Sequence, residues 1–154
     1  MGKLGAKLTT SADEFVEQAA IGDTYEITAG EIAMQRSGNE AVRAAAARML
    51  TDHMTSRHHL IAALEMNETQ GVQSPLQSLD GRRETMLAHL REASDEEFDR
   101  TYLDQQILAH EETTSLMETY GESGDNAQLR SLALSTFPVV KRHLSHMKDL
   151  RAQV

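Results

Sequence analysis

The 154-residue sequence contains no cysteine and no tryptophan, only two prolines, and 4% aromatic residues. Without cysteine, the chain can form no disulfide, no thiolate metal site and no cysteine nucleophile. The scarcity of aromatic residues argues against a β-sandwich or a barrel, where aromatic and β-branched side chains dominate. No apolar run approaches the roughly 20 residues that a transmembrane helix needs, so no integral membrane segment is expected.

Positive charge is also scarce, with 15 lysines and arginines against 24 aspartates and glutamates, a formal net charge of −9. Nucleic-acid-binding proteins present a basic face to phosphates, so nucleic acid is not expected as a partner. Residues 1–10 have no apolar segment of the signal-peptide type, which makes a cytoplasmic protein one alternative. We expect residues 1–10 to be a disordered or cloning-derived N-terminus and residues 11–154 to form one domain.

The sequence is instead rich in good helix formers, and apolar residues recur at alternating steps of three and four. Ser11 followed by Glu14 is typical of a helix start, and so is the segment 94–97. Turn signals occur at residues 37–39, 71–75 and 121–126. These patterns predict long helices over about residues 11–36, 40–68, 94–120 and 127–151, and a shorter helix over about 76–91.

Four long helices with a short helix in the longest connection predict an all-α, ferritin-like four-helix bundle. In that fold, two helical hairpins are joined by a crossover that carries the chain back along the bundle. An up-down-up-down bundle with the short helix packed on one end is the alternative. Small residues at Gly22 and Gly30 would let a neighbouring helix approach closely, and Pro138 is expected to bend the last helix.

Four ionisable residues fall on the apolar stripes, one on each long helix: Glu26, His53, His110 and His143. Polar groups at buried positions need partners, since each one left unsatisfied costs about 1–3 kcal/mol. Helical bundles build metal sites from one inward ligand on each of several helices. Imidazole combined with carboxylate suits zinc, iron, manganese or copper, and we expect zinc first.

The position of each candidate along its helix tests whether the four can meet. Glu26 and His53 lie about 12 and 15 residues from the first turn, within one helical turn of each other. His110 and His143 lie about 12 and 20 residues from a turn at 121–124, which would separate them by roughly 12 Å. A longer turn, or the bend at Pro138, would have to reduce that distance.

Otherwise His143 would belong to a separate polar cluster with Asp99 or Tyr102, which are also candidate outer partners of a metal site. Asp52 directly precedes His53 in the sequence, so their side chains lie on different faces of the helix and are not expected to pair with each other. The remaining histidines are expected to be exposed: His58, His59, His89 and His146.

A di-iron carboxylate site is not expected, because it requires Glu-x-x-His pairs. The residues three positions before the candidate histidines are apolar: Leu50, Ile107 and Val140. Three hypotheses remain: a metal-binding bundle, a non-enzymatic structural or stress protein whose histidines only form hydrogen bonds, and a metal-dependent oxidoreductase. The sequence does not decide whether the protein is an enzyme or whether it forms a homo-oligomer.

Short motifs in a fixed order resemble a bacterial ferritin-like family known as domain of unknown function 4142, often labelled predicted outer membrane protein. The resemblance covers about residues 13–147 and implies a ferritin-like bundle in the periplasm or cell envelope, without implying an activity. It also implies that the family's motif positions correspond to Glu26, His53, Asp99, Tyr102, His110 and His143. The motifs are Gly22-x-x-x-Glu26-x-x-x-Gly30, Arg48-Met49-x-x-Asp52-His53, Phe98-Asp99-x-x-Tyr102 with His110, and Phe137-Pro138-x-x-x-x-His143-Leu144.

Overall fold

The computed structural model describes residues 9–154, and within that range it contains helices and no strand. The expectation for the N-terminus concerns mainly residues 1–8, which lie outside the described residues. Thr10 is joined to the rest of the bundle, since its carbonyl accepts a hydrogen bond from the Asp125 amide at 3.1 Å. The elements are α1 (Ala12–Arg36), α2 (Glu40–Leu64), η1 (Asn67–Thr69), α3 (Gly81–Glu92), α4 (Phe98–Ser123) and α5 (Ala127–Arg151).

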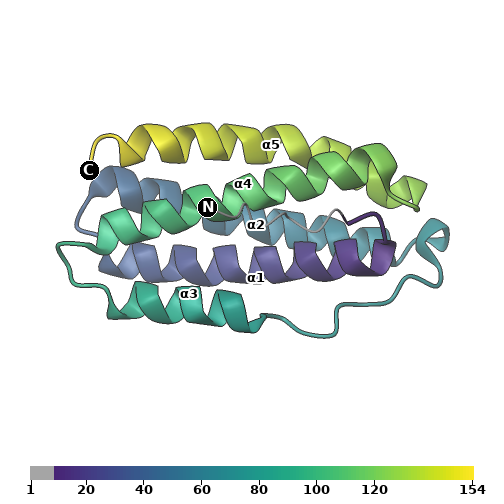
Figure 1. Ribbon diagram of the computed structural model, residues 1–154, viewed down its shortest axis with the longest axis horizontal. Coiled ribbons are helices and arrows are strands. Elements are labelled where there is room, and N and C mark those ends of the chain that lie inside the picture. The colour runs from purple at the N-terminus through teal and green to yellow at the C-terminus, as the bar shows by residue number, and fades with distance from the viewer. Residues whose placement is uncertain (1–8) are drawn as a thin grey trace, which may run out of the picture.

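The helices form two hairpins that lie side by side (Figure 1). One hairpin is α1–α2 and the other is α4–α5, with α1 against α4 and α2 against α5. The chain leaves α2 at one end of the bundle, returns along the outside through α3, and enters α4 at the opposite end (Figure 1). This crossover makes α2 and α4 run in the same direction. It confirms the predicted ferritin-like bundle over the up-down-up-down alternative.

Short polar side chains fix the starts of the helices. The Asn39 side chain accepts hydrogen bonds from the first amides of α2, and Asn126 accepts one from Leu129 at the start of α5. Ser11 makes no such bond through its side chain. The first amide of α1, that of Ala12, instead donates to Asp125 Oδ1 at 2.9 Å, so the α4–α5 turn caps α1.

The crossover differs from the prediction at both ends. Helix α2 ends at Leu64 and not near residue 68, and Gly71 adopts a φ of +89°, which favours glycine. Helix α3 begins at Gly81 and not near residue 76, because Asp80 caps it by accepting a bond from the Arg83 amide. Leu76 consequently lies in the extended connection with 74% of its surface exposed.

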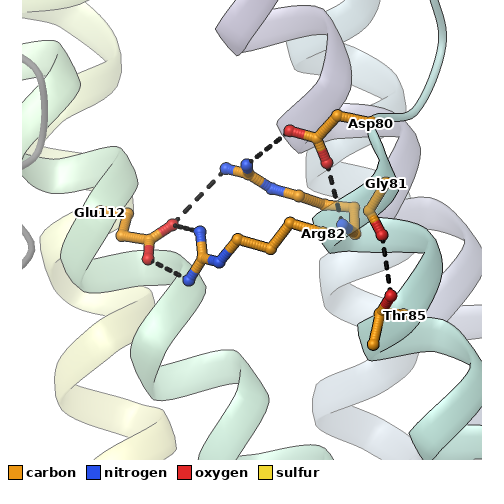
Figure 2. A network of polar contacts seen from close by, with 6 residues as sticks. Asp80, Gly81, Arg82, Thr85 and Glu112 are labelled. Carbon is orange, nitrogen blue, oxygen red and sulfur yellow. Dashed lines mark hydrogen bonds and ion pairs between the residues drawn. The ribbon is translucent and has the colours of Figure 1, made fainter.

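Two hydrogen-bonded ion pairs fasten the start of α3 to the middle of α4 (Figure 2). The Arg82 guanidinium donates to both oxygens of Glu112, and Arg83 lies 3.5 Å from the same carboxylate. Arg83 also pairs with Asp80 at 2.9 Å. Since Arg82 belongs to the crossover and Glu112 to α4, this network helps to set where the returning chain lies on the bundle.

The core consists of two apolar clusters, one toward each end of the bundle, with buried polar residues between them. The cluster at the α1–α2 turn contains Met49, Tyr102 and Met147 among others. The cluster at the opposite end includes Phe15 and Tyr120, whose rings stack at 4.1 Å. Hydrophobic burial at both ends therefore stabilises a bundle whose middle is polar.

The two glycines of α1 differ in their surroundings. A Cβ on Gly30 would lie 3.1 Å from the Ala46 carbonyl oxygen and 3.6 Å from Leu50 Cβ, so the absence of a side chain permits the close approach of α2. A Cβ on Gly22 would meet nothing within 4 Å. The expectation of close helix packing therefore applies to Gly30 and not to Gly22.

We expect Gly30→Leu to destabilise the protein by about 2–3 kcal/mol, because the added side chain must push α1 and α2 apart. Gly22→Ala should stabilise it by up to about 1 kcal/mol. Alanine reduces the conformational entropy of the unfolded chain, and its Cβ meets no other atom in the folded helix. Urea titrations of both variants measure these changes. Equal effects of the two substitutions would contradict the difference in packing.

Candidate metal centre

Three histidine rings from three helices meet in the middle of the bundle. His53 on α2, His110 on α4 and His143 on α5 are each more than nine-tenths buried. The distances between ring centroids are 5.8 Å for His53–His110, 6.0 Å for His53–His143 and 5.5 Å for His110–His143. Each ring contributes one nitrogen atom to a group of three atoms that all lie within 4.8 Å of one another.

His143 reaches this cluster because the α4–α5 turn lies later in the chain than the sequence suggested. Helix α4 continues to Ser123 and α5 begins at Ala127, which centres the turn on residue 125. His110 is then about 15 residues before that centre and His143 about 18 after it, a difference of about 4.5 Å along the helices. The roughly 12 Å separation expected between these histidines was wrong. Helix α5 itself runs unbroken through Pro138.

Two of the histidines donate a hydrogen bond to a carboxylate on a neighbouring helix. His53 Nδ1 lies 2.8 Å from Oδ1 of Asp23, which is itself buried on α1. His143 Nε2 lies 2.8 Å from Oδ2 of Asp52 on α2. A carboxylate only accepts hydrogen bonds, so each of these ring nitrogens must carry the proton.

His110 is held in the same way by its own helix. Its Nδ1 lies 2.8 Å from the Gln106 carbonyl oxygen, an acceptor that again requires the proton on Nδ1. The opposite nitrogens are then left with free lone pairs. These are the three ring atoms that are buried with no hydrogen-bond partner among the described residues: His53 Nε2, His110 Nε2 and His143 Nδ1.

Glu26 lies beside the cluster and not inside it. Its Oε1 is 3.6 Å from His110 Nδ1, and its Oε2 is buried without a hydrogen-bond partner among the described residues. Burial raises the pKa of the Glu26 carboxyl group, while His53, the Gln106 amide and His143 oppose that rise. A cation placed among the rings would therefore stabilise the ionised form of Glu26.

The two predicted outer partners lie in different places. Tyr102 is fully buried, and the pKa of its hydroxyl is well above the usual value, first because of burial and then because of the nearby Glu26 charge. Asp99 is eleven residues before His110, about 16 Å along α4. It accepts a hydrogen bond from Ser37 Oγ at 2.6 Å at the α1–α2 turn. Tyr102 is therefore close enough to Glu26 to feel its charge, whereas Asp99 belongs to the α1–α2 turn.

The three histidines differ in the ease with which they bind a proton. Burial, and after it the charge of His53, lower the pKa of His110 to about 4. Burial also lowers the pKa of His143 to about 4, in spite of its bond to Asp52. Burial acts in the same direction on His53, but Asp23 and the other carboxylates outweigh it, so the pKa of His53 is raised. His110 and His143 are therefore neutral near pH 7, the form in which imidazole binds metals.

The three residues that orient these rings were not predicted from the sequence to have that role. Asp23 stands three positions before Glu26, and Gln106 four before His110, spacings that place each pair on one helix face. That spacing could have identified both. Asp52 was correctly separated from His53, but its partner on α5 depends on which helices are neighbours. The four histidines expected at the surface are exposed: His58, His59, His89 and His146.

These features define a class: an all-α, ferritin-like bundle with three buried histidines that could hold a metal ion. The chain belongs to the family described as a domain of unknown function (DUF4142), which matches residues 3–150. This confirms the family resemblance found in the sequence. Among the curated proteins, none matches the sequence.

A solved structure titled "CopM in the Cu(II)-bound form" is similar to this chain in fold. The two share 15% sequence identity with a TM-score of 0.75, and the alignment covers 93% of this chain and 97% of the other. At that identity the similarity supports the helical bundle. None of the helices described in residues 9–154 is long and apolar enough to cross a membrane.

The metal-free protein should lose stability as the pH falls from about 6.5 to about 4, and His110 should account for much of the loss. Its pKa is lower in the folded than in the unfolded chain, so the unfolded chain binds more protons in this range. The stabilisation present above pH 6.5 is thus lost on acidification, by an amount on the order of 2 kcal/mol.

Urea titrations in EDTA at about pH 7.5 and about pH 4.5 would measure this change in wild type and His110→Gln. The variant should show a smaller dependence on pH. His59→Gln, which changes an exposed histidine of α2, should keep the wild-type dependence. A His110→Gln protein with the full dependence would show that another group is responsible.

Proposed function

We propose that this protein is a metal-binding protein that holds one divalent transition-metal ion between α2, α4 and α5. The ligands would be His53 Nε2, His110 Nε2 and His143 Nδ1. The observation that carries this proposal is the convergence of three buried lone pairs with no donor to satisfy them. Bonds of about 2.0–2.1 Å to a common ion would require the rings to move slightly closer together.

The surrounding acceptors support the same proposal. Metal-binding histidines usually donate their second nitrogen to a carboxylate or a backbone carbonyl, which fixes the tautomer and the ring orientation. Asp23, Asp52 and the Gln106 carbonyl oxygen provide that arrangement here. We propose Glu26 as the fourth group of the site, which would bind the ion after a side-chain rotation or balance its charge from its present position.

The donor set favours copper over zinc as the first candidate. Nitrogen and oxygen ligands bind divalent ions in an order that peaks at copper, and no thiolate is available to favour another metal. The similar bundle whose title names a Cu(II)-bound form agrees with this choice. We therefore propose Cu(II) first and zinc second, which reverses the order expected from the sequence; iron and manganese follow.

The two alternative functions explain fewer of the observations. A purely structural hydrogen-bond network would be expected to pair the free nitrogens, and three of them have no partner within residues 9–154. A di-iron type of oxidoreductase lacks the Glu-x-x-His pairs that such sites use. A stress-related role in the periplasm or cell envelope is part of the proposal on the basis of the family resemblance alone.

Untagged wild-type protein supplied with Cu(II) should retain about one equivalent after desalting, as measured by elemental analysis. His53→Gln, His110→Gln and His143→Gln should each weaken binding by about a hundredfold or more, because each removes a ligand. Asp23→Asn and Glu26→Gln should cost about 10–100-fold, the range typical of groups that orient or balance a ligand.

His59→Gln is the matched control, because it removes an exposed histidine from the helix that carries His53. It should bind like the wild type. Retention of less than roughly 0.2 equivalents by wild type, with no increase in the thermal midpoint, would contradict the proposal, since a site formed only on folding must stabilise the folded protein.

A further inference from the structure

The three orienting acceptors differ in how far they are from solvent. The side chain of Asp23 is 6% exposed, and Gln106 is fully buried. Asp52 is different, because 35% of its side chain is exposed while its Oδ2 accepts the bond from His143. Among the groups bonded to the three rings, Asp52 is therefore the one that reaches both the solvent and the cluster.

A cation stands beside this exposed carboxylate. Arg48, one turn before Asp52 on α2, places its Nε 3.7 Å from Asp52 Oδ2, and 72% of the Arg48 side chain is exposed. The same oxygen therefore faces His143 on its inner side and Arg48 on its outer side. An arriving metal ion would meet the attraction of Asp52 and the repulsion of Arg48 at the same place.

A cleft on the other side of the bundle does not provide another route to the rings. It has a volume of about 700 Å³ and lies between α1, α3, α4 and the crossover. Its lining includes Glu17, Gly22 and Glu112, but none of the three histidines and none of the side chains that orient them.

We propose that the Asp52–His143 pair is the port through which a divalent metal ion enters and leaves the buried site, with Arg48 setting the rate of entry. The ion would first bind the exposed Asp52 carboxylate. His143 would then rotate away from Asp52 and open a path along which the ion reaches the free nitrogens of the three rings. This inference rests on the proposed metal-binding function, and it assigns Asp52 a role in exchange as well as in orientation.

Arg57 offers a matched control for Arg48 on the same helix. It has the same charge and lies in the groove between α1 and α2, where it donates a hydrogen bond to Thr24 at 3.0 Å. Replacing either arginine by glutamine changes the net charge equally. Arg48 borders Asp52 in the groove between α2 and α5, so only its removal should act on the proposed port.

Stopped-flow mixing with Cu(II), followed by tyrosine fluorescence, would measure the association rate; the absence of tryptophan leaves this signal free of background. Arg48→Gln should speed association about three- to tenfold at low salt, and less at high salt where charges are screened. Arg57→Gln should stay within about twofold of wild type. Asp52→Asn should slow association about tenfold, whereas Asp23→Asn should act mainly through faster dissociation.

A wild-type protein that binds Cu(II), but whose association rate responds equally to Arg48→Gln and Arg57→Gln, would overturn the port and leave the proposed function standing. An unchanged rate in Arg48→Gln would do the same. Absence of Cu(II) binding by the wild type at equilibrium would overturn the proposed function and this inference together. Because Arg48 is exposed, its substitution should leave the fold intact, and circular dichroism checks this.

Discussion

The middle of this bundle depends on one constraint: three imidazole rings are buried at the same level, and each must have at least one satisfied nitrogen. The acceptors that meet this requirement come from three different helices, namely Asp23 on α1, Asp52 on α2 and the Gln106 carbonyl on α4. They fix the tautomers and therefore the side of each ring on which a lone pair remains. The chemistry of the cavity is thus decided by groups that would not themselves touch a metal ion.

The burial of apolar side chains in the two clusters offsets the free-energy cost of this polar middle. Burial of unpaired polar atoms costs about 1–3 kcal/mol each, and the bundle contains several, among them Tyr102 Oη and Glu26 Oε2. Packing at both ends, with the Phe15–Tyr120 stack at one of them, stabilises the helices independently of the centre. A structure arranged in this way can keep lone pairs directed at one point without losing its fold.

Most of the fold could be predicted from the sequence, because helix formation and amphipathic spacing are local properties. The ends of α1 and α5, the crossover topology and the inward positions of His53, His110 and His143 all follow from periodicity and turn residues. The partners could not be predicted in the same way. Asp52 bonds to His143, 91 residues later, and this depends on the rotation and neighbours of α2. The level of His143 depended on whether α4 ended near residue 120 or at Ser123, a difference that local sequence signals do not resolve.

The arrangement of protons in the centre favours the proposed metal site over a hydrogen-bond network alone. Because Asp23, Asp52 and the Gln106 carbonyl each accept a hydrogen bond from a ring N–H group, the opposite nitrogens are all acceptors, and acceptors that lie close together repel. One proton can relieve this, and His53 is the ring with a raised pKa, held by Asp23 and the nearby carboxylates. A divalent ion can relieve it more fully, since it can accept all three lone pairs and also balance Glu26. Because imidazole must be neutral to bind a metal, any proton on the inner nitrogen of His53 would leave when an ion binds, so metal binding in the proposed site would weaken as the pH falls.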